Sequence, residues 1–347
     1  MSEPRTRLDG IDTFRAIAVA AVVYIHLSPF RGAEYAGTPA QAVADLLNLP
    51  SRFAVPFFFL VAGYFFASRL QRHARPLPAA AHSARRIGAI FVFWSACYIV
   101  VPAALRALYR GNPALLGDTI GEKVRWMAAH PWASVFHGPQ EHLWFLPALA
   151  TGIVLIAVMA WFGLPASYAV AAGAALYLVA LAAGSYSQLT GVELPFNPRN
   201  GPFVSLLFVA AGAWLHGRQA TARRTALAIA AIGLLTCAFE ALALRGITGR
   251  ALSSHDALVG TVPMGIGIFL LALASPRLGA GTPLPDLGRL ALGVYACHML
   301  VALPLTVASA PIPPTVGELS LAPAVLLLSA AAAWTMARHP RLARVVT

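Results

Sequence analysis

The sequence predicts an all-α membrane protein of about ten transmembrane helices with both termini in the cytoplasm. Two features of the composition support this class: 59% of the 347 residues are hydrophobic and only 11% are charged. Soluble domains average about 25% charged residues. A third observation, the position of arginine and lysine between the apolar runs, gives the orientation. The net charge of +12 is therefore attributed to membrane topology, and nucleic-acid binding is not expected.

Ten apolar runs approach the roughly 20 residues that a helix needs to cross the hydrocarbon core. They lie near residues 13–30, 51–69, 87–108, 142–162, 166–184, 201–217, 225–244, 257–274, 289–308 and 319–337. Acidic residues among the first bases, and no small-residue cleavage site after the first run, argue against a removable signal peptide. We therefore expect one transmembrane domain over residues 1–347, with no additional soluble domain.

The orientation follows from the basic residues, because arginine and lysine accumulate in cytoplasmic loops. With an even number of spans, the side that holds both termini also holds most of the 25 basic residues. The long segment 109–141 then faces the outside. Its Trp, His, Pro and charged residues suggest either a cap over the outer mouth of the protein or a plain connecting loop.

The first apolar run carries two ionisable residues, Arg15 and His26, on one helical face. Eleven residues make three turns plus about 20°, and place the two side chains roughly 16 Å apart along the helix axis. Asp12 lies one turn before Arg15 and can pair with it. Arg15 alone could be an interfacial anchor, and His26 alone could be a packed structural histidine. Because ionisable groups at membrane depth usually face a cavity, one continuous polar passage along this helix is the simplest explanation.

Four motifs in order resemble the acyltransferase-3 family of integral membrane acyltransferases. "LDGIDTFRAIAVAAVVYIHL" resembles the first helix of the family, and "VPFFFLVAGYFFASRL" its second-helix signature, with Ala62 where serine is usual. "EHLWFLPAL" is similar to the H-x-W-F-L segment, and "LGVYACHMLV" to the late Y-x-x-H motif. The resemblance implies acyl transfer, commonly of acetyl from acetyl-CoA, to a sugar hydroxyl. It also implies functional roles for Arg15 and His26.

A cluster of arginines follows the second run, where the family often shows an R-x-x-R pair. The candidates for binding the phosphates of CoA are Arg69, Arg72, Arg85 and Arg86, with Arg75 as an alternative partner of Arg72. A guanidinium group binds phosphate oxygens through two parallel hydrogen bonds. Ordinary positive-inside topology also explains basic residues at this place.

The acceptor is expected at the opposite end of the passage, where Glu141, His142 and Trp144 open the fourth run. His142 is either a surface histidine or an acceptor-binding residue, and the indole of Trp144 offers a flat face to a sugar ring. Tyr295 and His298 of the Y-x-x-H motif fall at mid-membrane and are expected to line the same passage. Glu240 is expected mainly to form an ion pair with Arg245, one turn later.

We therefore expect an acyl-CoA-dependent O-acyltransferase of the plasma (bacterial inner) membrane. His26 would be the general base, because histidine titrates near neutrality. The acceptor would be a cell-surface polysaccharide, glycolipid or lipid-linked precursor, with no metal and a possible homodimer. The alternative is a transporter or flippase that uses Arg15 and His26 as a proton or substrate relay.

Overall fold

The computed structural model describes residues 8–30, 35, 37–72, 75–309 and 312–347, with the side chain of Arg72 outside this part. The described residues form helices joined by short connections, with no strand among them. The N-terminal half contains α1 (Asp9–His26), α2 (Pro39–Ser51), α3 (Ala54–Arg72), α4 (Pro76–Tyr109), α5 (Ala114–Ala129), α6 (Pro131–Phe136), η2 (Glu141–Trp144) and α7 (Phe145–Trp161). The C-terminal half contains α8 (Ala166–Ala183), α9 (Ser187–Thr190), α10 (Pro202–Leu215), α11 (Arg223–Thr248), η3 (Leu252–Ser254), α12 (Thr261–Leu273), α13 (Leu284–Arg289), α14 (Ala291–Ala308), α15 (Pro314–Arg338) and α16 (Ala343–Val346).

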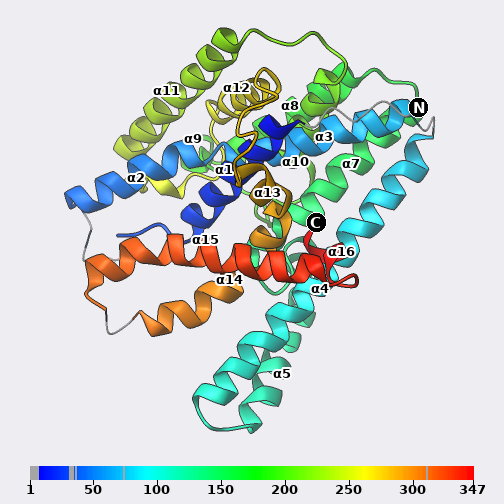
Figure 1. Cartoon of the computed structure of the whole chain (residues 1–347). Coiled ribbons are helices and arrows are strands. Elements are labelled where there is room, and N and C mark those ends of the chain that lie inside the picture. The colour runs from blue at the N-terminus through cyan, green and yellow to red at the C-terminus, as the bar shows by residue number, and fades with distance from the viewer. Residues whose placement is uncertain (1–7, 31–34, 36, 73–74, 310–311) are drawn as a thin grey trace.

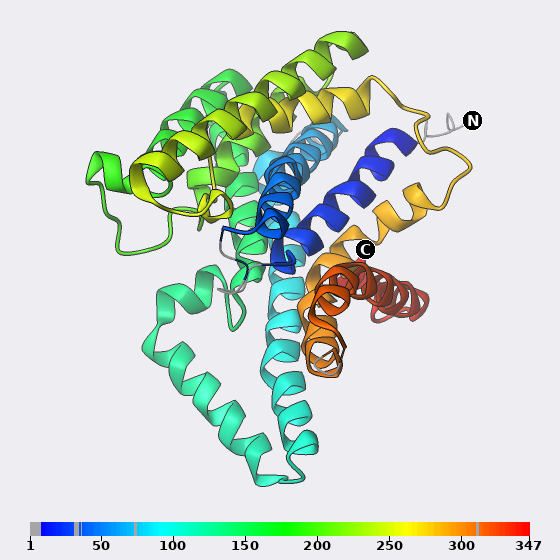
Figure 2. The same cartoon turned by 90° about the vertical axis from the view of Figure 1, so that its left-hand side faces the viewer.

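Helix α10 lies in the interior and packs against α3, α7 and α8. All nine residues from Val204 to Gly212 are buried, so this helix has no broad polar face, as expected for a helix surrounded by others. Helix α1 packs against α3, α13 and α14, and α12 packs between α3 and α11. Figures 1 and 2 show α1 crossing the middle of the molecule, with α14 and α15 on one side of it and α11 and α12 on the other.

Two glycines allow α3 and α10 to approach closely. A Cβ atom at Gly63 would lie 1.9 Å from the backbone oxygen of Val209, and one at Gly212 would lie 2.0 Å from the backbone oxygen of Leu60. Small residues of this kind let helix backbones come together in membrane proteins. In the described structure, the neighbour of Gly63 is therefore the backbone of another helix.

Each of the ten predicted runs contains a helix, but only part of the predicted span count is supported. Seven helical segments are long and apolar enough to cross a membrane by length and composition. Helices α10 and α12 are shorter, at 14 and 13 residues, and α1 carries Asp9, Asp12 and Arg15. The number of crossings is thus not confirmed as ten, and the cytoplasmic location of the termini remains a prediction.

The segment 109–141 is largely helical, so it is not a plain connecting loop. Helix α5 packs against α4 and is followed by α6 and η2. In Figure 2 the far end of α4 and α5 project together from the remaining helices. The chain then returns to the bundle at Glu141, where the segment becomes part of the functional site.

Candidate functional site

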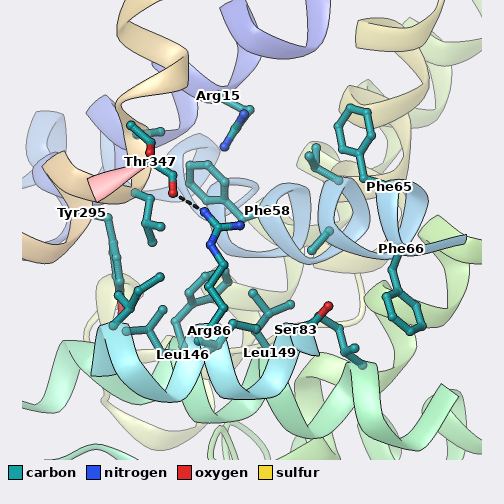
Figure 3. Close-up of a pocket in the computed structure, with 18 of the residues that line it drawn as sticks. Arg15, Phe58, Phe65, Phe66, Ser83, Arg86, Leu146, Leu149, Tyr295 and Thr347 are labelled. Carbon is teal, nitrogen blue, oxygen red and sulfur yellow. Dashed lines mark hydrogen bonds between the residues drawn. The ribbon is translucent and has the colours of Figure 1, made fainter. Parts of the chain in front are cut away.

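Two cavities lie beside α1, and most of the predicted site residues line one or the other. The first, which we call the arginine cavity, has a volume of about 280 Å³ and is bounded by α1, α3, α4, α7 and α14. Arg15, Arg69 and Arg86 line it together with His82, and the rest of the wall is mostly apolar. Arg15 and Arg86 approach this cavity from opposite sides (Figure 3).

The guanidinium groups of the arginine cavity are only partly occupied by protein partners. Arg15 forms the predicted ion pair with Asp12 at 3.2 Å, while its Nε is buried and has no hydrogen-bond partner among the described residues. Arg69 donates to Oγ of Ser83 at 2.9 Å. Arg86 donates to the backbone oxygen of Thr347, as the dashed line in Figure 3 shows. Three cations around one cavity make a site that suits an anionic ligand.

The predicted arginine cluster divides into residues that reach the cavity and one that does not. Arg69 and Arg86 line it, whereas Arg85 is exposed and does not belong to its lining. Adjacent residues of a helix point about 100° apart, so the two neighbouring arginines cannot face the same space. The side chain of Arg72 lies outside the described residues.

The second cavity, which we call the histidine cavity, has a volume of about 500 Å³. It contains four residues predicted from the sequence: His26, Glu141, His142 and Trp144. Its remaining lining residues are Lys123 and Trp126 of α5, His137, Pro139, Gln140, Arg199 and Met299. Burial lowers the pKa of His137, which favours the neutral imidazole at pH 7.

His26 meets His298 at the inner end of the histidine cavity. Nε2 of His298 lies 3.2 Å from Nδ1 of His26, and Nδ1 of His298 lies 2.6 Å from the backbone oxygen of Tyr295. A carbonyl oxygen only accepts hydrogen bonds, so Nδ1 of His298 carries its proton and the neutral ring accepts at Nε2. His26 then donates from Nδ1, and its Nε2 is the unprotonated nitrogen. The hydrogen-bond chain therefore selects the tautomer of His26.

His142 belongs to a second hydrogen-bond chain, and its side chain is buried. The hydroxyl of Tyr98 donates to the backbone oxygen of Ala296 at 2.8 Å and lies 3.2 Å from Nε2 of His142. Nε2 of His142 is thus the donor in that contact, and Nδ1 is an unprotonated nitrogen with no partner among the described residues. The ring of His142 lies 5.9 Å from that of His26 and 5.0 Å from that of His298.

The three imidazoles lie close together, with a hydrogen bond between His26 and His298 and ring contacts of both with His142. Within the described residues, no cluster of three or more His, Cys, Asp or Glu side chains has a geometry that could hold a metal ion. The cysteines Cys97, Cys237 and Cys297 are all free thiols. The imidazoles at the site can form hydrogen bonds and transfer protons.

Two cavities are found where one continuous passage was predicted, and Tyr295 and Phe145 form a partition between them. Tyr295 lines the arginine cavity, and its hydroxyl donates to the backbone oxygen of His142, which lines the histidine cavity. Phe145 lies beside Tyr295, with ring centroids 5.5 Å apart. His298 has no exposed surface and lines neither cavity, although it was expected to line the passage. Aromatic side chains lie between the two cavities, and one open channel along α1 stays a prediction.

Several site residues were not found by the sequence reasoning. Arg199 donates to Oε2 of Glu141 at 3.0 Å and lies 3.5 Å from a carboxylate oxygen of Asp256. Its guanidinium group also lies over the ring of Trp144 at 5.8 Å. Nothing in the sequence around Arg199 signals this role, because its partners come from distant segments. Tyr98 was missed for the same reason.

Glu240 does not form its predicted ion pair with Arg245 in the described structure. Its carboxylate instead accepts from the backbone N–H groups of Val259 and Gly260, at 3.0 and 2.7 Å, and from the hydroxyl of Tyr186. Those amides precede α12, so Glu240 provides acceptors at the start of that helix. Its contacts give it a structural role outside the two cavities.

Comparison with known proteins shows the family to which the chain belongs. Residues 8–338 match the family described as "Acyltransferase domain", acyltransferase-3. The chain is also 26% identical over 321 residues to a protein named "Amino-acid racemase" from Enterococcus faecalis, covering 85% of this chain and 41% of that protein. It is 28% identical over 312 residues to "Serine/alanine racemase" from Enterococcus gallinarum, covering 83% and 40% respectively. The chain thus spans about two fifths of these relatives, and no solved structure matches it.

Proposed function

Because this chain belongs to the acyltransferase-3 family of membrane acyltransferases, we propose that it transfers an acetyl group from acetyl-CoA to a sugar hydroxyl. The acceptor would be a cell-surface polysaccharide, a glycolipid or a lipid-linked precursor in the plasma (bacterial inner) membrane. The observation that carries the proposal is the hydrogen bond between His26 and His298, which leaves Nε2 of His26 unprotonated beside a cavity. The racemase names belong to proteins more than twice as long as the matched segment, and we carry no racemase activity to this chain.

The donor would bind with its phosphates in the arginine cavity. Arg15, Arg69 and Arg86 supply charge-assisted donors there, and the buried Nε of Arg15 still needs an acceptor. The apolar wall beyond them suits the uncharged arm of CoA. From Arg15 to His26 the offset along α1 is roughly 16 Å, so the thioester has to extend along the helix toward the histidines.

The acceptor would enter the histidine cavity, where Trp126 and Trp144 offer aromatic faces to a sugar ring. Nδ1 of His142 is a buried acceptor and can hold a hydroxyl group of the sugar in position. The partition at Tyr295 has to shift for the thioester carbonyl to reach this hydroxyl. Its hydroxyl is held by one hydrogen bond to the backbone of His142, which a change of rotamer can release.

In the transfer step, Nε2 of His26 accepts the proton of the acceptor hydroxyl. The oxygen attacks the thioester carbonyl, the new C–O bond forms and the C–S bond breaks. The protonated His26 returns its proton to the departing thiolate, so the products are the sugar ester and CoA. Nε2 of His298 accepts the hydrogen bond from Nδ1–H of His26 throughout, which stabilises the His26 imidazolium and fixes its orientation.

The proposal is tested with the purified chain in lipid nanodiscs, given radiolabelled acetyl-CoA and de-O-acetylated envelope glycan from the cells that make the protein. We expect release of CoA that depends on the glycan, and labelled ester on the glycan. His26→Ala should abolish both, whereas the control His339→Ala, at an exposed histidine, should retain them. Glycan or lipid movement across proteoliposomes without CoA release would instead support the transporter or flippase alternative.

A further inference from the structure

A third cavity adjoins the histidine cavity on the side of Arg199. We call it the distal cavity; its volume is about 260 Å³, and it is formed by the end of α8, the start of α10 and the connection between α11 and α12. The distal cavity adjoins η2, which carries Glu141 and His142, through the ion pair of Arg199 with Glu141. The polar side chains that line it are Ser185, Ser187, Asn197, Arg199, Arg250, Ser254 and Asp256.

Arg199 lies between the histidine cavity and the distal cavity. It lines both of them, with Glu141 on the side of the histidine cavity and Asp256 on the side of the distal cavity. The guanidinium group binds one carboxylate on each side, at 3.0 and 3.5 Å. Its Nε is buried and has no hydrogen-bond partner among the described residues. A single side chain therefore lies between two polar spaces and contacts one carboxylate of each.

The lining of the distal cavity identifies the kind of ligand it suits. Arg250 supplies donors and Asp256 supplies acceptors. The hydroxyls of Ser187 and Ser254 already donate to backbone oxygens of Gly184 and Ala251, so they remain available as acceptors. An acyl tail is disfavoured because it would cover two arginines and a carboxylate without satisfying them. A lone anion is disfavoured by the carboxylate of Asp256. A polyhydroxylated group, which both donates and accepts at several points, matches the whole set.

We infer that the distal cavity binds a second sugar unit of the acceptor, next to the unit that is acylated in the histidine cavity. The inference rests on the proposed function and narrows it: the acceptor is an oligosaccharide or polysaccharide chain, not a single sugar. Arg199 lies between the two units and binds to the linkage region. The residues of the distal cavity are thus specificity determinants for chain length and do not take part in proton transfer.

The inference is tested by comparing two forms of one acceptor. Envelope glycan from the cells that make the protein is de-O-acetylated with base, and half of it is hydrolysed with acid to monosaccharides. The wild-type protein should have a higher kcat/KM for intact glycan than for the monosaccharides. In Asp256→Asn and in Arg250→Ala the ratio of the two kcat/KM values should fall about tenfold, the effect of one lost hydrogen bond to the ligand.

Matched controls separate this effect from a general loss of charge or folding. Glu193→Gln and Arg245→Ala change exposed residues that line neither cavity and should leave the ratio unchanged. If the wild type labels both fractions equally well, or if both test variants keep the ratio within twofold, the second sugar site is wrong while acyl transfer stands. If the wild type labels neither fraction, the proposed function itself fails.

Discussion

The contact between His298 and His26 gives the sharpest prediction about catalysis. His298 has no exposed surface, and its Nε2 lies 3.2 Å from Nδ1 of His26. Replacement by leucine keeps a side chain of similar size but removes the acceptor. The Nδ1–H group of His26 is then left without this acceptor, at a cost of about 1–3 kcal/mol. If that cost falls on the transition state, kcat drops roughly 5- to 150-fold.

The assay is steady-state acetyl transfer in nanodiscs, with kcat and KM measured separately for both substrates. His298→Leu should lower kcat and leave KM for acetyl-CoA within about twofold. The reason is that His298 orients the base, His26, and takes no part in binding the donor. His298→Gln, whose amide oxygen can accept from His26, should recover part of the rate. Equal kcat values for wild type and His298→Leu would refute the reasoning, as would a leucine variant that changes only KM.

Three further predictions concern packing, donor binding and pH. Gly63→Ala should lower the free energy of unfolding by about 1–3 kcal/mol, because the new Cβ would collide with the backbone oxygen of Val209. The measurement is Tm in detergent, and an unchanged Tm would contradict the close packing of α3 and α10. Arg86→Ala should raise KM about tenfold for acetyl-CoA but not for the acetyl thioester of pantetheine, whereas the control Arg85→Ala, outside the cavity lining, should raise neither. Burial lowers the pKa of His255, so the unfolded chain binds a proton that the folded protein does not, and Tm should fall as pH drops below about 6.5. His255→Leu should flatten this dependence, and a slope identical to that of the wild type would exclude His255 as its source.

The environment of His255 explains the sign of the last prediction. Its side chain has no exposed surface, and neither ring nitrogen has a hydrogen-bond partner among the described residues. After burial, the charges of Arg250 and Arg52 lower its pKa further, while Asp256 and Glu240 oppose them. An imidazolium at this place would be a buried and largely uncompensated charge, so the protonated form favours unfolding. Leucine removes a buried polar group and adds no charge.

The partition at Tyr295 has a consequence for the order of events in the proposed reaction. The aromatic side chains between the two cavities keep the donor away from the imidazoles until they shift. Such a barrier limits hydrolysis of the thioester by water, which competes with any acyl transfer in a wet site. A low rate of CoA release without acceptor is therefore the expected behaviour of the wild type.

Much of the helical architecture could be predicted from the sequence, because long apolar runs and membrane dimensions leave little choice of structure. The pairing of Asp12 with Arg15 was also predictable, since it lies within one turn of one helix. The same holds for the presence of Arg15 and His26 on a common face. The helical character of segment 109–141 was missed, because its polar composition does not resemble a membrane span.

The contents of the site were decided by the tertiary structure. His26 and His298 are 272 residues apart in the chain, and Tyr98 is 44 residues from His142. Only the packing of α1, α4, α7 and α14 brings these rings together, and only their hydrogen bonds assign the tautomers. By itself, the sequence determined which side chains are costly to bury and therefore need partners. Which partners they found depended on helix packing, because contacts between distant segments have no local sequence signal.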